Sequence, residues 1–356
     1  MNDNFRILRK DARDGARARL EARQLPDWLG DFRRSAAHYQ LSPELEVALN
    51  MALNVGAPLL VTGEPGTGKT QVGWYLGWYF EIPVFDYQVR SNATAEDLKY
   101  EFDAVAYLRS AQLGEEAERT RYLHPRALWQ AYEAQTLAVV LIDEIDKAPR
   151  DFPNDLLQEL DRHRFRHPFE DRDVAPKAGP PLVVVTSNAE RRLPDAFLRR
   201  CIVHHIELTD KLVEAAVGAH FPALEKKLKD TAIRRFWALR EVDQLSKRPA
   251  TAELLVWLAV LSAQEVDEAR LANAPLRELP GLSALIKDHT DRELLPGGAG
   301  RGGAFAVWVV GWRGVARRDP GAAGAIGGGG SVPIGDRAGS GVPALALAGA
   351  AGDCAF

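Results

Sequence analysis

This sequence has few cysteines, no long apolar run and no excess of positive charge. Only Cys201 and Cys354 occur among 356 residues, so we expect neither a disulfide framework nor a cysteine-based metal site, and a reducing cytoplasm is the expected compartment. The formal net charge is -4, which excludes an overall positive field that would recruit nucleic acid or an acidic membrane. No apolar run approaches the length of a membrane span, and residues 1–23 lack the apolar core of a signal peptide. We therefore expect neither membrane insertion nor export.

Short apolar runs alternate with helical patterns along most of the chain. Hydrophobic residues make up 46% of the sequence, enough to fill about two domains. Ser42, Pro43 and Gly56 predict the start and the end of a helix that leads into the first apolar run. Buried strands that alternate with helices indicate an α/β fold, a parallel five-stranded sheet sandwiched by helices. The predicted strands lie in residues 57–63, 81–89, 137–146, 180–188 and 201–208.

Four segments of different character follow one another. They are an N-terminal helical segment (1–40), the α/β domain (41–209), a small domain of three helices (210–290) and a Gly/Ala-rich tail (291–356). Eighteen of the thirty glycines lie from Gly297 onward, and no lysine follows Lys287. Such a composition cannot bury enough apolar surface to offset its ordering entropy, so we expect a largely disordered tail. The abrupt change also raises the hypothesis of a reading-frame shift near residue 290.

The stretch "GEPGTGKT" follows the first predicted strand and opens a helix. Backbone N–H groups of such a turn surround a concavity, and the positive end of the helix points into it, so the turn suits a phosphate group. Glycine allows close approach and positive φ angles, a lysine reaches the terminal phosphates, and a threonine hydroxyl ligates Mg²⁺. The alternative is a chance Gly/Pro turn. The predicted phosphate-binding residues are Gly63, Glu64, Pro65, Gly66, Thr67, Gly68, Lys69 and Thr70, and the last of these is also a predicted metal ligand.

A second motif, "VVLIDEID", ends the third predicted strand with acidic residues. Ligands of open parallel sheets bind at the carboxyl ends of the strands, where Asp143 and Glu144 emerge. Asp143 is the second predicted metal ligand, acting through water, and Glu144 is the predicted base that polarises the attacking water. Taken alone, such acids are usually helix caps or solvated side chains. The phosphate-binding turn favours the catalytic interpretation.

These two motifs, followed by "VVVTSN" and "LPDAFLRRC", resemble those of an AAA+ ATPase, and more narrowly of the MoxR-like branch of the dynein-related group. The resemblance covers about residues 41–263. It implies a P-loop NTPase core with a helical lid domain, and ATP and Mg²⁺ as the bound groups. It also implies an oligomeric ring, usually a hexamer, because a neighbouring subunit supplies an arginine to each site.

The resemblance assigns roles to three polar residues after the acid motif. Asn188 matches the residue called sensor 1, which helps to position the attacking water, although an asparagine can also end a strand by local hydrogen bonding. Arg199 and Arg200 match the arginine-finger region, and a planar, permanently charged guanidinium suits the charge that develops on phosphoryl oxygens. The alternative for this pair is a solvated turn cation. The sequence does not tell which of the two is the finger.

The small helical domain of relatives contributes a second sensing arginine to the nucleotide site. The candidate for this role is Arg248, although relatives often carry the arginine just after a proline and Arg248 precedes Pro249. The alternatives are that Lys247 takes this role, or that Arg248 is merely a capping cation. Residues 90–129 and 161–180 resemble the helix-2 insertion and the hairpin before sensor 1 of related motors. There they protrude toward a pore or a partner, and an ordinary surface elaboration is the alternative.

Histidine and aromatic clusters receive structural interpretations. His163 and His167 have the spacing of two ligands on one helical face, but no third ligand is evident, so a solvated basic strip is preferred. Aromatic residues follow the phosphate-binding turn at helical spacing, and we expect them to pack in the core against the sheet. These are Trp74, Tyr75, Trp78 and Tyr79.

Three functions are compatible with these residues. The leading hypothesis is an ATP-hydrolysing motor or chaperone that remodels a protein partner, which by resemblance is a von Willebrand factor A domain protein. A nucleic-acid motor is the first alternative, against which the acidic balance stands, although "RHRFRH" could line a pore. An ATP-gated scaffold with little turnover is the second, against which the presence of Glu144 argues.

Overall fold

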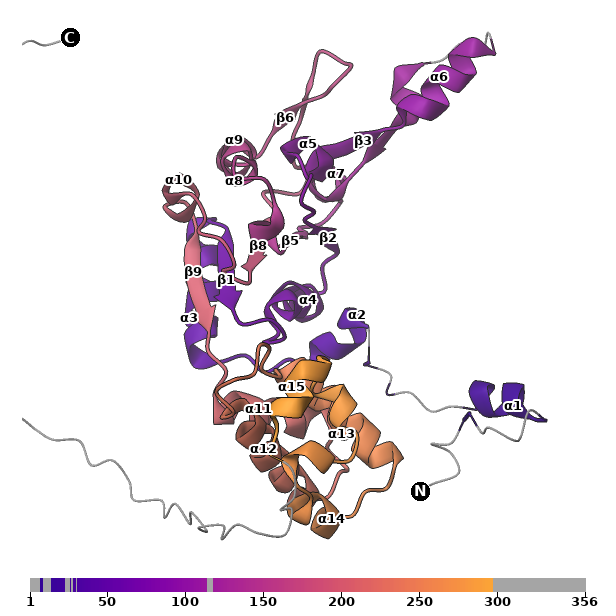
Figure 1. Ribbon diagram of the computed structural model, residues 1–356. Helices are drawn as coiled ribbons and strands as arrows, with labels where there is room; N and C mark the ends of the chain where they lie inside the picture. Colours follow the sequence, from indigo (N-terminus) through magenta and orange to yellow (C-terminus); the bar gives the residue numbers. More distant parts are fainter. Residues whose placement is uncertain are drawn as a thin grey trace, which may run out of the picture. The chain divides into compact units, whose positions relative to one another are not determined.

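The computed structural model describes residues 7–8, 14–22, 26, 28–29, 31–113 and 118–296 (Figure 1). Two units are distinguished, residues 1–303 and 304–356, and the second lies wholly outside the described residues. The predicted Gly/Ala-rich tail therefore falls outside them from residue 297 onward. Within the described ranges, no helix combines the length and the apolar character that crossing a membrane requires.

Five parallel strands form the central sheet, in the order β2-β5-β8-β1-β9. This confirms the predicted number of strands and their parallel direction. Parallel neighbours must be joined by long crossovers, which here contain the helices that flank the sheet. The strands are β1 (Leu59–Gly63), β2 (Val84–Gln88), β5 (Val139–Asp143), β8 (Leu182–Ser187) and β9 (Ile202–Ile206).

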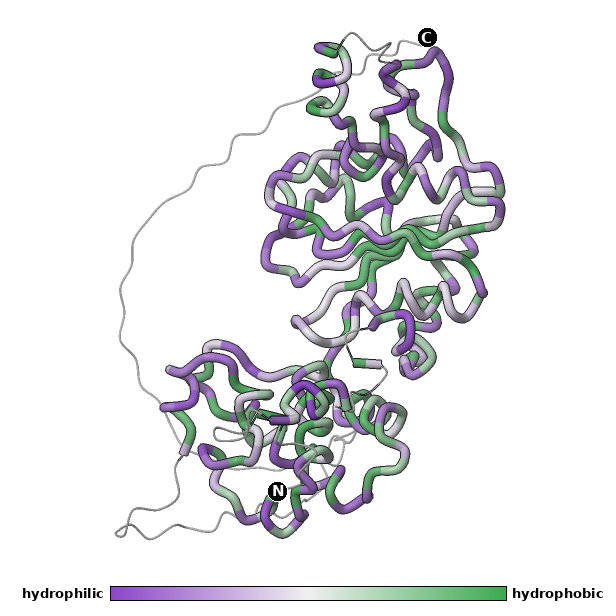
Figure 2. Tube along the Cα trace, turned by 90° about the vertical axis from the view of Figure 1, so that its right-hand side faces the viewer, coloured by the Kyte–Doolittle hydropathy of each residue, from purple (hydrophilic) through white to green (hydrophobic). Residues whose placement is uncertain are grey.

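Helices cover both faces of the sheet. They are α3 (Pro43–Val55), α4 (Lys69–Phe80), α7 (Ala127–Glu133), η3 (Ile145–Lys147), α8 (Phe152–Asp155), α9 (Leu157–Arg162) and α10 (Asp195–Leu198). Val139 and Leu141 of β5 pack with α3 and α4, whereas Val140 and Ile142 pack with α7 and α8 on the opposite face. All four side chains are 0% exposed, which explains why this strand is apolar throughout. Figure 2 shows the apolar strands as a green layer.

The predicted core contact of the α4 aromatics is met by Trp74 alone, which is half-buried and packs against the core cluster that includes residues of β1, β5 and β8. Tyr75 is half-buried outside that cluster, and Trp78 and Tyr79 are 51% and 60% exposed. Small and aliphatic residues face the sheet, because the helix approaches it so closely that a Cβ at Gly77 would collide with a side chain of β2. The rings of Trp78 and Tyr79 are thereby turned outward. The buried residues of α4 are Lys69, Val72, Gly73, Leu76 and Gly77.

The described part of the N-terminal segment consists of short helical elements. They are α1 (Ala16–Glu21), α2 (Phe32–Ser35) and the 3₁₀ turn η1 (Ala36–His38). Asp31 caps α2 by accepting the N–H groups of Arg33 and Arg34. The elements α2 and η1 pack against α4, so the N-terminal segment lies beside the start of the helix that follows the phosphate-binding turn.

The two insertions contain small antiparallel elements. The first comprises α5 (Ala95–Lys99), β3 (Tyr100–Phe102), α6 (Ala104–Gln112), η2 (Arg119–Tyr122) and β4 (Leu123–Pro125), and the second is the hairpin of β6 (Phe165–Arg166) and β7 (Asp173–Val174). The rings of Phe102 and Phe169 lie 5.1 Å apart between centroids. The Arg119 guanidinium lies over both Phe169 and Tyr107. The insertions therefore meet in one aromatic cluster.

The histidines at 163 and 167 do not share a helical face. His163 ends α9 with a φ of 49°, whereas His167 lies between β6 and β7 of the hairpin and is 4% exposed. Its ring nitrogen accepts the N–H groups of Phe169 and Glu170, and burial lowers the pKa of His167. His167 is thus a buried structural residue and no part of a solvated strip. In the part of the chain that the structure describes, no group of three or more His, Cys, Asp or Glu side chains could hold a metal ion.

The helical domain contains the three predicted helices and further short elements. Its members are α11 (Asp210–His220), α12 (Lys226–Arg240), α13 (Thr251–Ala263), α14 (Glu268–Asn273), η4 (Leu276–Glu278), η5 (Leu282–Ala284) and α15 (His289–Leu294). Phe236 and Trp257 are 0% exposed at the centre of its core. Leu295 is 2% exposed in the same core, so this domain continues beyond the expected boundary at residue 290.

Candidate active site

The predicted phosphate-binding residues, hereafter the phosphate loop (residues 63–70), connect the end of β1 to the first turn of α4. Gly63 has a φ of 152°, and a Cβ there would lie 2.8 Å from the carbonyl oxygen of Ile206 on the neighbouring strand. Only glycine fits at this position without displacing β9. The first N–H groups of α4 have no acceptor within the helix, so the positive helix end is available to an anion.

Lys69 lies within the phosphate loop, and its side chain is held by backbone carbonyls. Its Nζ donates hydrogen bonds to the carbonyl oxygens of Gly63 at 3.0 Å and Glu64 at 2.8 Å. Burial lowers the pKa of Lys69, although the carboxylates of Asp143 and its acidic neighbours act in the opposite direction. An ammonium group that is already desolvated and aimed into the loop is well placed to bind a phosphate oxygen.

Thr70 and Asp143 come from different motifs and meet in the site. The Thr70 hydroxyl donates to Asp143 Oδ1 at 2.8 Å, and the Thr186 hydroxyl donates to the same oxygen at 2.6 Å. Hydroxyl and carboxylate oxygens are the ligands that Mg²⁺ prefers. Two adjacent oxygen donors beside a phosphate loop therefore fit a magnesium ion that takes its remaining ligands from phosphate and water.

Glu144 has an unusual backbone conformation and a carboxylate with three donors. Its φ is 60°, in the left-handed region that non-glycine residues rarely adopt, and its N–H donates to Thr186 Oγ1 at 2.9 Å. The carboxylate accepts from Lys147 Nζ at 2.5 Å, Gln88 Nε2 at 3.1 Å and Asn188 Nδ2 at 3.4 Å. Burial raises the pKa of Glu144, but these hydrogen bonds outweigh it and the pKa is lowered. The carboxylate is therefore held ionised.

Asn188 directly follows β8 and contacts the acid motif. Its backbone N–H donates to Asp146 Oδ1 at 3.1 Å, and the N–H of Glu190 donates to the other oxygen of Asp146 at 3.2 Å. Asp146 is 3% exposed, so these bonds anchor the end of β8 to the turn after β5. They hold the Asn188 amide beside Glu144.

A cavity of about 440 Å³ joins the phosphate loop to an apolar chamber. At its polar end lie Asp143, Glu144, Thr186 and Asn188. At its other end the N-terminal segment and the helical domain supply rings and aliphatic side chains, with the ring of Trp28 edge-on to that of His220 at 4.7 Å. The lining residues of the apolar end include Trp28, Phe32, His38, Tyr39, Leu212, His220, Leu255 and Val256.

Arg199 and Arg200 lie outside this cavity, next to the C-terminal end of α10. The Arg200 guanidinium donates to both carboxylate oxygens of Asp161, at 3.2 and 2.8 Å, and to the carbonyl oxygen of Ala196 at 3.0 Å. Arg199 is exposed and makes no ion pair or side-chain hydrogen bond with any of the described residues. The two arginines therefore differ in what they are free to contact.

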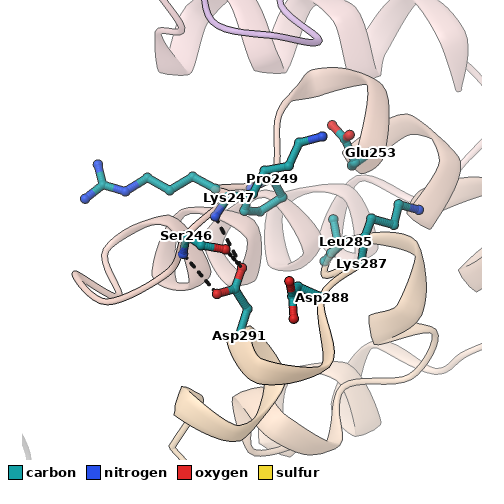
Figure 3. Close-up of a pocket in the computed structure, with 9 residues that line it drawn as sticks. Ser246, Lys247, Pro249, Glu253, Leu285, Lys287, Asp288 and Asp291 are labelled. Atoms are coloured by element: carbon teal, nitrogen blue, oxygen red, sulfur yellow. Dashed lines mark hydrogen bonds between the residues drawn. The ribbon is translucent and has the colours of Figure 1, made fainter.

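Arg248 is also outside the cavity that contains the phosphate loop. It lines a 450 Å³ cavity with Lys247 and Glu64, and a 330 Å³ pocket of the helical domain shown in Figure 3. In that pocket the buried Asp291 carboxylate accepts the N–H groups of Ser246 and Lys247. The helical-domain arginine that does bind the phosphate loop is Arg240, which donates to Glu64 Oε2 at 2.7 Å.

Four contacting residues were missed by reasoning from the sequence. Gln88 and Thr186 carried a usable signal, because each is a polar residue near the carboxyl end of a strand beside β5. Lys147 directly follows the acid motif, three residues after Glu144, a spacing that allows contact in a helical turn. Arg240 carried no local signal, since its contact with Glu64 joins positions 176 residues apart.

Residues 58–201 match the family model described as the AAA domain of the dynein-related subfamily. No curated protein matches the sequence. A crystal structure of an ATPase candidate from Cytophaga hutchinsonii is similar over 68% of this chain and 79% of that chain, with 13% identity and a TM-score of 0.36. A structural likeness of that size carries no argument. The AAA+ core is therefore inferred from the family match and from the parallel sheet.

Proposed function

We propose that this AAA+ ATPase, whose parallel sheet and flanking helices form a P-loop NTPase core, is a MoxR-like motor that remodels a protein partner. One observation carries the proposal for the site: Lys69, Asp143 and Glu144 line the same 440 Å³ cavity, although they come from two separate motifs. The triphosphate occupies the phosphate loop, and the adenine base occupies the apolar end of the cavity. Rings and aliphatic side chains suit a flat, largely apolar base.

Hydrolysis is an in-line attack of water on the terminal phosphorus, with cleavage of its bond to the bridging oxygen and release of ADP and phosphate. Thr70 and Asp143 would hold Mg²⁺, which supplies positive charge to the phosphate oxygens. Lys69 donates to the terminal phosphate from the loop. Glu144 is ionised and accepts a proton from the attacking water, and Asn188 fixes the orientation of that carboxylate.

The finger of this motor is assigned to Arg199, because Arg200 is engaged by Asp161 within its own subunit. An exposed guanidinium outside its own cavity is available to the site of a neighbouring copy, which supports an assembly in which subunits complete each other's sites. We propose the hexameric ring that is usual in the family. Arginine fingers raise phosphoryl-transfer rates by roughly 10³ to 10⁵, so hydrolysis should depend on assembly.

The insertions favour a protein partner over nucleic acid. Two arginines of the second insertion are paired with acidic neighbours, because Arg166 binds both Asp171 and Asp173, and Arg164 contacts Asp173 at 3.9 Å. These pairs reduce the positive charge that the hairpin offers to a phosphate backbone. The α6 helix of the first insertion exposes Val105 and Leu108, at 79% and 57%. We propose that a von Willebrand factor A domain protein is the partner that such relatives suggest.

Phosphate release by the wild type and by Glu144→Gln tests the enzymatic part of this proposal. We expect magnesium-dependent turnover in the wild type, loss of at least about 100-fold in the variant, and retained ATP binding in both. Equal, near-zero rates would instead favour the ATP-gated scaffold. ATP-trapped Glu144→Gln rings are then the bait for the protein partner, whereas stimulation of turnover by DNA, reduced by salt, would promote the nucleic-acid motor.

A further inference from the structure

Arg240, at the end of α12, spans the helical domain and the phosphate loop. Its side chain is 10% exposed and lies over the rings of Phe236 and Trp237, at 5.9 and 5.7 Å from their centroids. One arm of the guanidinium donates to the carbonyl oxygen of Pro249 at 2.6 Å, and the other donates to Glu64 Oε2 at 2.7 Å. A planar guanidinium can serve both acceptors at once, whereas a lysine ammonium on a flexible stem holds such a pair less rigidly.

The contact is part of a close approach between the two domains. The N–H of Ala252 donates to the carbonyl oxygen of Gly66 at 3.3 Å. Gly66 has a φ of 78°, and a Cβ there would lie 2.9 Å from the Cβ of Ala250. The outer turn of the phosphate loop is therefore packed directly on the start of α13, and Arg240 binds the residue that begins this turn.

Glu64 connects this interface to the binding machinery. Its carbonyl oxygen accepts from Lys69 Nζ and from the Thr67 hydroxyl, each at 2.8 Å. Its carboxylate, which is 55% exposed, is the group that Arg240 binds. A carboxylate on the loop that receives a triphosphate repels the ligand, and the repulsion is offset only while a cation is paired with it.

We propose that Arg240 is a positioning residue of the ATPase: it neutralises Glu64 and fixes the outer turn of the phosphate loop, so that the helical domain contributes to phosphate affinity through Glu64. This inference rests on the proposed nucleotide pocket and assigns to it a residue that neither motif contains. The contribution is electrostatic, so it grows with the number of phosphate charges. It is also moderate, because the Glu64 carboxylate is 55% exposed and water screens the pair.

The test compares nucleotide affinities of Arg240→Met, Glu64→Gln and the double variant, by calorimetric titration with ATP, ADP and adenosine. Methionine keeps the apolar stem on Phe236 and Trp237 and removes the charge. We expect Arg240→Met to weaken ATP roughly fivefold, about 1 kcal/mol, to weaken ADP less, and to leave adenosine unchanged. In the Glu64→Gln background the same substitution should cost much less. Glu64→Gln alone should bind ATP at least as tightly as the wild type.

Controls separate this role from a loss of structure. Lys227→Met removes an exposed cation from the same helix and should leave all three affinities unchanged. Arg240→Lys retains the charge and should restore most of the ATP affinity that methionine loses. Equal weakening of adenosine and ATP, or a Glu64→Gln variant that binds ATP several-fold more weakly than the wild type, would overturn the inference. A wild type that binds no ATP would overturn the proposed nucleotide pocket as well.

Discussion

Thr70 and Asp143, 73 positions apart in the sequence, are joined by a hydrogen bond of 2.8 Å between Oγ1 and Oδ1. The hydroxyl of Thr186 organises this pair, because it donates to the same Asp143 oxygen at 2.6 Å and accepts the N–H of Glu144 at 2.9 Å. One buried hydroxyl thus contacts both Asp143 and Glu144 of the acid motif. Its position on the neighbouring strand keeps the proposed metal ligand and the proposed base in fixed relation.

We predict that Thr186→Val lowers kcat of ATP hydrolysis about tenfold, with a smaller change in KM. Valine has nearly the same shape, so the variant loses a hydrogen-bonding group worth about 1 to 1.5 kcal/mol without leaving a cavity. Steady-state phosphate release at several ATP concentrations measures both constants. Thr62→Val on β1 is the matched control, since that hydroxyl bonds to His205 and not to the acid motif. An unchanged kcat in Thr186→Val would remove Thr186 from the site.

Arg199 and Arg200 should differ in their contribution to ATP hydrolysis. Arg199→Ala is expected to lose ATP hydrolysis by roughly 10³-fold or more, as removal of a finger does. Arg200→Ala should keep most of it and lose less than about 1 kcal/mol of stability, because its ion pair with Asp161 is nearly half exposed on both sides. Mixing Arg199→Ala with Glu144→Gln subunits should restore measurable turnover, since some sites then combine an intact base with an intact arginine. No recovery, with mixed rings demonstrated, would contradict a finger in trans.

Alanine substitutions at Gly77 and Gly218 should change the stability of the protein in opposite directions. A Cβ at Gly77 in α4 would collide with Val84 and lie 3.1 Å from the carbonyl oxygen of Ile82, so Gly77→Ala should reduce the free energy of unfolding by about 1 to 3 kcal/mol. At Gly218 in α11 nothing lies within 4 Å. Gly218→Ala should therefore stabilise by up to about 1 kcal/mol through helix propensity. Denaturant titration measures both values, and a stabilising Gly77→Ala would mean that α4 sits farther from the sheet.

Asp291 should make the stability of the helical domain depend on pH in the acid range. The backbone N–H of Ser246 lowers the pKa of Asp291 most, against burial, and the Ser246 hydroxyl and the Lys247 N–H lower it further. A pKa lower in the folded than in the unfolded chain stabilises the fold above the unfolded value, about 4, and this contribution is lost as the pH falls through the folded value.

Thermal unfolding between pH 7 and pH 2.5 provides the measurement for Asp291. Asp291→Asn is expected to lower the unfolding temperature at pH 7. Below pH 4 the unfolding temperature of this variant should fall less steeply than that of the wild type. Asp243→Asn, an exposed carboxylate before the same loop, should follow the wild-type profile. Superimposable profiles of Asp291→Asn and the wild type would show that the carboxylate does not hold α15 to this loop.

The sheet and the phosphate loop were predictable because their signals are local. Four consecutive apolar residues of β5 are buried on both faces, which is what a run without alternation indicates. Both ends of α3 were equally predictable, since Ser42 accepts the N–H of Leu45 at the start and Gly56 ends the helix with a φ of 67°. For the candidate site, the acids at the carboxyl end of β5 lie beside the loop because parallel strands place their ends at one edge.

What escaped prediction depends on distances between elements. The spacing of the α4 aromatics is compatible with either face of the helix, and only the close approach at Gly73 and Gly77 decides that Trp78 and Tyr79 turn away from the sheet. The pairing of Arg240 with Glu64 likewise requires knowing where the helical domain lies against the phosphate loop. Neither the distance of α4 from the sheet nor the position of the helical domain can be read from a short window of residues.

The edge-to-face contact between the rings of Phe102 and Phe169 couples the two insertions. Separating these rings would forfeit about 0.5 to 1.5 kcal/mol of ring contact, and the Arg119 guanidinium would lose one of the two rings that it covers. A force applied at the tip of the second insertion would therefore reach the first, whose β3–β4 ladder leads back to α7 and the sheet.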